Sequence, residues 1–198
     1  GVKAVLTADD APNLMFGENQ PLFCQDVVNY VGEEVAAVAA VDEVTAEKAR
    51  ELIEVEYEPL PAVTSLQKAL RPDAPQIHGQ SPGTIALTFD KDYGDPEKAF
   101  ADCDFIFTDE FKSPPQHNCL AEFHVAVANF SRPDRLMLWT PTQSAATYKI
   151  FLSKAFHLTE SQVQVNFLNI GGAFTGRGTP KPHHLVAALL SRHTGRPV

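Results

Sequence analysis

The stretch VQVNFLNIGGAFTGRG, residues 163–178, constrains the fold more than any other part of this 198-residue chain. Its first six residues form an apolar strand pattern. Four glycines then fall within eight residues, together with Phe174 and Arg177. Glycine tolerates positive φ and lets a ligand approach the main chain closely, so glycines between a strand and a helix predict a cradle for a ligand.

Two other segments are expected to meet this loop. Residues 139–144 read WTPTQS and join a strand pattern to a helix pattern, a position from which loops often present side chains to ligands. The second segment is unusually polar and contains Gln116, His117, Glu122 and His124. These groups either satisfy the hydrogen bonds of a strand and of the loop backbone or perform general acid–base catalysis, and the first interpretation is favoured.

A phosphate group is one candidate occupant of the loop. The pattern G-x-x-x-x-G-K-[ST] needs a lysine for the β and γ phosphates and a hydroxyl for magnesium. Gly171 and Gly176 have the required interval, but Arg177 and Gly178 stand where those two side chains belong. The dinucleotide-binding pattern G-x-G-x-x-G is absent as well. A tight structural turn therefore stays open beside the ligand-binding interpretation.

The first part of the chain predicts a small α/β unit. Its strand patterns cover residues 2–6, 26–30, 34–41 and 53–57, and its helix covers residues 43–52. Asp42 is placed to cap the helix, whose Val44, Ala49 and Leu52 form an apolar stripe. Residues 71–83 then carry three prolines and two glycines with almost no periodicity, which indicates a domain boundary.

The pattern changes after this boundary. Strands are predicted at 85–89, 105–111, 125–130, 136–140 and 163–168, and helices after Asp95, at 145–156 and at 184–193. The Pro-Asp turn between the third and fourth of these strands predicts a hairpin. We therefore expect an α+β protein with two domains, residues 1–80 and 81–198.

Composition excludes several classes of function. The formal net charge of −9 argues against a nucleic-acid partner, because phosphate binding needs clustered Lys and Arg. No apolar run approaches the roughly 18 residues of a membrane span. His183, His184 and His193 have no carboxylate or cysteine at ligand spacing, so we expect surface or helix-start histidines rather than a metal site.

Several stretches together resemble a known family. They are GEEVAAVAA at 32–40, EVEYEPLPAV at 54–63, the segment 94–100 and the glycine loop. In order and spacing they are similar to the molybdenum-binding subunit of the xanthine dehydrogenase and aldehyde oxidase family. The resemblance implies a partial α/β hammerhead domain up to about residue 80. It also implies that the mixed-sheet first part of a molybdopterin-binding domain follows, so that the chain is a fragment of a longer subunit.

The resemblance also implies an activity. Members hydroxylate an aldehyde or an electron-poor aromatic heterocycle with oxygen from water, and pass electrons from molybdenum to [2Fe–2S] clusters and often to FAD. The implied partners are the rest of the molybdenum subunit, iron–sulfur and flavin subunits or domains, and a small-molecule substrate, in the cytoplasm. The family's catalytic Glu comes from much later in the subunit, so we expect no catalytic residue here and no activity from this fragment alone.

Site residues follow by matching the family's motifs. The family's loop usually reads G-G-G-F-G-G-K, and Gln143 matches a Gln that hydrogen-bonds the oxo ligand of molybdenum, an indirect metal contact. The implied cofactor-binding residues are Gln143, Gly171, Gly172, Phe174, Thr175, Gly176 and Arg177. The motif Q-x-H-x-x-x-E places Gln116, Asn118 and Glu122 in the active-site vicinity, with Asn118 at the position of its His.

Departures from these motifs keep two alternatives open. Thr175 replaces a loop glycine, and a β-branched residue disfavours positive φ and adds a side chain where backbone alone is expected. Together with Asn118, it motivates a relative that keeps the fold as an assembly or binding module without catalysis. The other alternative is a nucleotide-phosphate site at residues 171–178. Gly178 stands where xanthine-oxidising members commonly place a Glu, which disfavours a purine substrate.

Overall fold

The computed structural model describes residues 1–11, 14–17, 20–78, 83–85, 87–117, 119–174 and 176–198. They form two compact units, one of Gly1–Glu58 with Asn118–Val198 and one of Pro59–His117. Helices and strands are mixed in the first unit, which confirms the α+β class. The expected domains, residues 1–80 and 81–198, stay a prediction about the complete protein.

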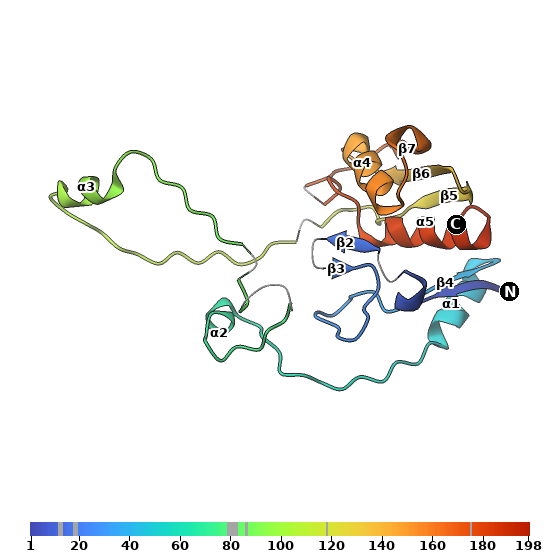
Figure 1. Ribbon diagram of the computed structural model, residues 1–198, viewed down its shortest axis with the longest axis horizontal. Helices are drawn as coiled ribbons and strands as arrows, with labels where there is room; N and C mark the ends of the chain where they lie inside the picture. The colour runs from blue at the N-terminus through green and yellow to red at the C-terminus, as the bar shows by residue number, and fades with distance from the viewer. Residues whose placement is uncertain (12–13, 18–19, 79–82, 86, 118, 175) are drawn as a thin grey trace. The chain divides into compact units, whose positions relative to one another are not determined.

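A three-stranded sheet lies on one side of helix α5 (Pro182–Thr194) in the first unit (Figure 1). Strand β5 (Val127–Arg132) pairs antiparallel with β6 (Arg135–Pro141), and β7 (Val163–Leu168) pairs parallel with β6. The hairpin is thus confirmed. Parallel neighbours need a crossover, which helix α4 (Ala145–Ala155) and the short 3-10 helix η2 (Glu160–Gln162) provide.

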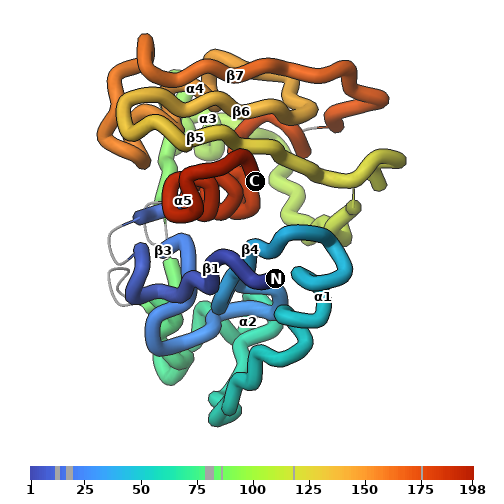
Figure 2. The backbone as a smooth tube through the Cα atoms, turned by 90° about the vertical axis from the view of Figure 1, so that its right-hand side faces the viewer, coloured from blue at the N-terminus to red at the C-terminus, as the bar shows by residue number. Residues whose placement is uncertain are grey.

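Helix α5 lies along this sheet and covers its buried face (Figure 2). Gly195 ends it in the left-handed conformation, with φ 67°, as expected for a glycine C-cap. The Ser191 hydroxyl accepts a hydrogen bond from the Phe130 amide at 2.7 Å, which ties the helix to β5. The core side chains of these elements are Ala128, Phe130, Leu136, Leu138, Tyr148, Leu152, Phe156, Val163, Leu185, Ala188 and Leu190.

The N-terminal segment packs against the same helix. Strands β1 (Val2–Leu6) and β4 (Ala37–Ala40) pair antiparallel and both contact α5. The 3-10 helix η1 (Ala8–Asp10) and strands β2 (Met15–Gly17) and β3 (Gln20–Pro21) lie between them in the sequence. Asp42 is the N-cap of helix α1 (Glu43–Glu51), and its carboxylate accepts a hydrogen bond from the Thr45 amide at 2.8 Å.

Some predicted elements of this segment do not form. Residues 26–30 and 53–57 are not strands, and the predicted strand 34–41 shortens to β4. The expected inward stripe of α1 is wrong, because Val44 and Leu52 are exposed. Apolar spacing gives a helix one apolar face, but a packed neighbour must be present to bury that face.

The described residues of the second unit form two short helices, α2 (Leu66–Ala69) and α3 (Pro96–Ala101). The side-chain oxygens of Ser65 and Asp95 cap them by accepting hydrogen bonds from the Lys68 and Lys98 amides. The predicted strand 105–111 does not form, and the described residues of the predicted strand 85–89 are not in a strand either. Their large apolar side chains, such as Leu87 and Phe107, are exposed. A strand needs a second strand to satisfy its amides and carbonyls, and the described part of this unit offers none.

Candidate functional site

The glycine loop joins the end of β7 to the start of α5. Within it, the Gly176 amide donates to the Ala173 carbonyl at 2.7 Å and closes a tight turn. Phe174 sits in this turn at φ 40° and is 69% exposed. A bulky residue at positive φ is strained, and such strain persists where the surroundings enforce it, often at functional sites.

Gly172 is explained by the position of Phe174. A Cβ atom on Gly172 would lie 2.7 Å from the Phe174 ring, closer than real contacts allow. The Phe174 ring can therefore lie over the main chain only because residue 172 has no side chain.

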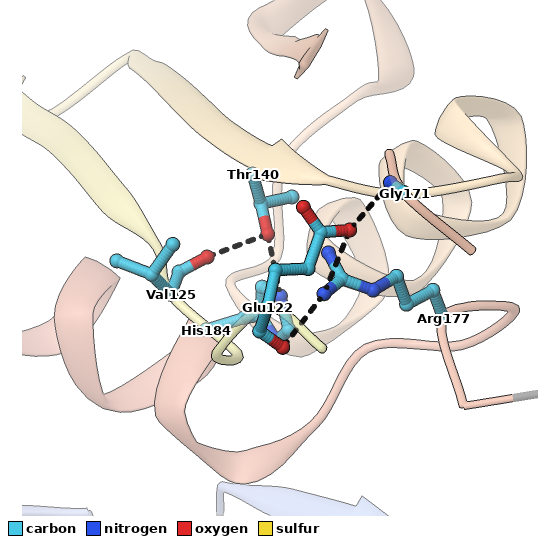
Figure 3. Close-up of polar contacts among 6 residues, drawn as sticks. All are labelled: Glu122, Val125, Thr140, Gly171, Arg177 and His184. Atoms are coloured by element: carbon cyan, nitrogen blue, oxygen red, sulfur yellow. Dashed lines mark hydrogen bonds and ion pairs between the residues drawn. The ribbon is translucent and has the colours of Figure 1, made fainter. Parts of the chain in front are cut away.

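Glu122 fastens the loop from a segment far away in the sequence (Figure 3). Its Oε1 atom accepts the Gly171 amide at 2.8 Å and lies 3.1 Å from Arg177 Nη2. The same Nη2 atom donates to the Glu122 main-chain carbonyl at 3.2 Å. One carboxylate thus holds both ends of the loop, and the expected contact of this polar segment with the loop is observed for Glu122.

Arg177 is the buried half of this ion pair. Its side chain is 1% exposed, whereas that of Glu122 is 36% exposed. A buried charge is costly unless it is paired and hydrogen-bonded. Burial of Arg177 in this loop conformation therefore requires the Glu122 carboxylate as its ion-pair partner. The Nε and Nη1 atoms of Arg177 are buried and have no hydrogen-bond partner among the described residues.

The segment 139–144 meets the loop at the Arg177 main chain. The Arg177 carbonyl accepts the Thr142 hydroxyl at 3.1 Å and the Gln143 amide at 3.3 Å. The Gln143 side chain is exposed at this end of the sheet. A hydrogen bond from the backbone amide therefore places Gln143 beside the glycine loop and leaves its side chain accessible to a ligand.

The other predicted site residues are distributed as follows. Gly171 is exposed, and Gly172 and Gly176 are partly buried. Gln116 is exposed and belongs to the second compact unit, and its place near the site stays a prediction. Asn118 and Thr175 lie outside the described residues.

A buried histidine, which the sequence did not reveal, supports the Glu122 segment. His184 is 1% exposed and lies in the first turn of α5, so of the two expected placements it takes the helix start and not the surface. Its Nδ1 atom accepts the Lys181 amide at 2.9 Å, and its Nε2 atom lies 3.0 Å from the Thr140 hydroxyl. Burial lowers the pKa of His184 to about 3, with a further contribution from His183. The only available signal was the position of His184 at N3, where side chains often bond back to the N-cap amide.

His183 lies beside it and is also held neutral. Its ring centroid is 3.9 Å from that of His184 and 5.9 Å from that of His124. Burial lowers the pKa of His183 to about 4, and His124 and Lys181 lower it further. Within the described part of the chain, no group of three or more His, Cys, Asp or Glu side chains is arranged to hold a metal ion. None of the described helices is long and apolar enough to cross a membrane.

These features fit an anionic organic cofactor better than a directly bound metal. Hydrogen-bond donors come from the exposed side-chain amide of Gln143, from the loop backbone, and from the Nε and Nη1 atoms of Arg177, which have no partner among the described residues. The exposed Phe174 ring adds an apolar surface beside them. Hydrogen-bond donors next to an aromatic ring suit a polar heterocycle such as a pterin.

Comparison with known proteins gives the same answer. A molybdopterin cofactor-binding domain matches residues 77–198, and the a/b hammerhead domain of aldehyde oxidase and xanthine dehydrogenase matches residues 1–61. A probable xanthine dehydrogenase subunit of Bacillus subtilis is 36% identical over the whole chain, which covers 27% of that protein.

Two solved structures share the fold over the entire chain. Quinoline 2-oxidoreductase from Pseudomonas putida is 31% identical with a TM-score of 0.86, and this chain covers 27% of its length. Reconstituted CO dehydrogenase from Oligotropha carboxidovorans is 30% identical with a TM-score of 0.87, again with 27% covered. The chain thus spans about a quarter of the length of these relatives, and it belongs to the family of molybdopterin-binding subunits of the xanthine dehydrogenase and aldehyde oxidase type.

Proposed function

We propose that the complete subunit to which this chain belongs is a molybdopterin-dependent hydroxylase and that the glycine loop forms one wall of its active site. The substrate class is an aromatic heterocycle or an aldehyde, and electrons pass to [2Fe–2S] and FAD centres on partner subunits or domains. Residues 1–80 would be the partial hammerhead domain and residues 81–198 the first part of the cofactor domain, in keeping with the two matched ranges.

The observation that carries this proposal is the attachment of the loop at both ends by Glu122. A site wall must keep its shape when a ligand arrives, and an ion pair with a buried arginine supplies that rigidity. The Gly171 amide is already used by Glu122, so it shapes the loop instead of donating to a ligand. Contacts to the cofactor are left to the remaining loop backbone, the Phe174 ring and Gln143.

When bound, the cofactor supplies the two-electron oxidation, with water as the source of the inserted oxygen. The residues of this chain bind and orient it. Gln143 would donate a hydrogen bond from its exposed side chain, Gly176 would allow close approach of the main chain, Gly172 would make room for the Phe174 ring, and Phe174 would pack on the cofactor. Thr175 belongs to the same proposed set. A direct contact of Arg177 would use its Nε or Nη1 atom, because Nη2 is taken by Glu122.

The test is metal analysis and turnover of the purified complete subunit with its partners. We expect stoichiometric molybdenum and oxidation of an aldehyde or a nitrogen heterocycle, with the product labelled when the reaction runs in isotope-labelled water. A folded subunit without molybdenum contradicts the proposal. Molybdenum without turnover on such a panel favours the non-catalytic relative, and nucleotide binding by calorimetry in a molybdenum-free protein favours the phosphate site.

A further inference from the structure

The segment that carries Glu122 lacks regular structure of its own. Residues 119–126 belong to neither a helix nor a strand, and β5 begins only at Val127. A carboxylate on such a segment holds the loop in place only if something else holds the segment. The question is therefore what fixes the main chain just before β5.

The β5–β6 ladder stops short of this segment for a covalent reason. The register pairs Val127 with Trp139, so Pro141 would lie opposite Val125. Proline has no amide hydrogen, and a backbone hydrogen bond from Pro141 to Val125 is impossible. The Val125 carbonyl instead accepts the side-chain hydroxyl of Thr140 at 2.8 Å.

His184 completes this substitute contact (Figure 3). The Thr140 hydroxyl has one hydrogen, which it donates to Val125, so it accepts a hydrogen bond from His184 Nε2 at 3.0 Å. That tautomer leaves Nδ1 unprotonated and able to accept the Lys181 amide at 2.9 Å, and Nδ1 also lies 3.1 Å from the Lys181 carbonyl oxygen. Thr140 and His184 are both 1% exposed.

Packing fixes the imidazole from the side. The Tyr148 ring from α4 meets His184 edge-on, with centroids 5.0 Å apart. Helices α4 and α5 thus both determine where the imidazole lies, and through Thr140 they determine where Val125 lies. Glu122 is three residues away, so its main chain stays within about 10 Å of this anchor.

We propose that His184 and Thr140 are positioning residues: their hydrogen bonds hold the Val125 carbonyl and thereby keep Glu122 on Gly171 and Arg177. That these hydrogen bonds help to shape a cofactor-binding wall rests on the proposed function. That they protect the Gly171 amide from hydrogen exchange does not, because Glu122 accepts that amide without any ligand.

The test is hydrogen–deuterium exchange of the purified protein, read on the peptide that contains Gly171. Thr140→Val removes the hydroxyl and keeps the shape, whereas Thr140→Ser keeps the hydroxyl. We expect exchange at Gly171 to rise about tenfold in the Val variant, as for the loss of one hydrogen bond, and to stay near wild type in the Ser variant. Glu122→Gln shows that the peptide reports the Glu122 contact, and amides of β7 serve as the internal reference.

Equal protection of Gly171 in the Val and Ser variants overturns the proposal when Glu122→Gln does change it. If Thr140→Val fails to fold, His184 offers a second pair. His184→Gln places an amide donor near the Nε2 position, whereas His184→Asn retains an acceptor for Lys181 but is too short to reach Thr140. We expect loss of Gly171 protection in the Asn variant alone, and equal protection in the two variants contradicts the proposal. A complete subunit without molybdenum would contradict the proposed function, but the hydrogen–deuterium exchange of the Thr140 and His184 variants would still test the positioning role.

Discussion

The same sequence pattern has different structures in the two compact units. Alternating apolar residues form strands β5 and β6 in the first unit, whereas the alternating phenylalanines of residues 105–111 in the second unit form no strand. Phe130 is 2% exposed against the Phe156 ring, but Phe107 is 91% exposed. Alternation gives a segment one apolar face, and a neighbouring strand and a covering helix then decide whether the strand forms.

The largest effect that separates the two units is expected from matched phenylalanine substitutions. Phe130→Ala should lower the free energy of unfolding by about 3–5 kcal/mol, because it opens a cavity in the core. Phe107→Ala should change it by less than about 0.5 kcal/mol, because the ring is exposed. Urea unfolding of both variants measures the contrast. A similar loss in both would mean that residues 105–111 pack in solution.

The two units also differ in their ion pairs. Glu122 meets a buried arginine, whereas Glu110 and Lys112 of the second unit are both about three-quarters exposed, with Lys112 Nζ 3.0 Å from Glu110 Oε1. Glu122→Gln should cost about 1–2 kcal/mol, after allowance for the partial exposure of the carboxylate. Glu110→Gln should stay within about 0.5 kcal/mol of wild type. Equal costs in urea unfolding would remove Glu122 as the fastening point of the loop.

Acid should destabilise the first unit through its buried histidines. The pKa values of His183 and His184 in the folded chain, about 4 and about 3, lie below the ordinary value of 6.5. The unfolded chain therefore takes up protons first, so the stability is complete above pH 6.5 and falls as the pH drops toward these values. At pH 5.5 each histidine should cost about 1.4 kcal/mol relative to pH 7.5.

Urea unfolding across this pH range checks the histidine effect. His184→Gln should reduce the pH dependence by the share of one histidine. The same slope in this variant and in wild type would assign the acid sensitivity to other groups.

The smallest effect on stability is expected at Gln143. Its side chain is exposed, so Gln143→Ala should change the free energy of unfolding by less than about 0.5 kcal/mol. Turnover of the complete subunit should nevertheless fall about 10²–10³-fold, the usual cost of one lost donor to developing charge. Gln67→Ala, on exposed helix α2, is the matched control. Unchanged turnover in Gln143→Ala would remove this residue from the site.

Local patterns predicted the elements that depend on local chemistry. The strand before the glycine loop, the C-terminal helix, the Asp42 cap and the helix after Asp95 all form as expected. These features depend on neighbouring residues, so a single sequence contains the information.

The contacts that assemble the site depend on residues far apart. Glu122 and Arg177 are separated by 55 positions, and their pairing follows from the folded sheet, not from spacing. The contact between Thr140 and His184 likewise joins residues 44 positions apart in the sequence. The family resemblance pointed to segments that include Glu122, Gln143 and the glycine loop, but it did not indicate which side chain would bond to which.

The most direct test of the central claim is electron paramagnetic resonance of pentavalent molybdenum in the complete subunit. Wild type, Gln143→Ala and Gln67→Ala are compared at equal molybdenum content. If Gln143 and the glycine loop face the metal, the spectrum of Gln143→Ala shifts while that of Gln67→Ala superimposes on wild type. Three superimposable spectra would contradict the claim that this end of the sheet forms a wall of the molybdenum site.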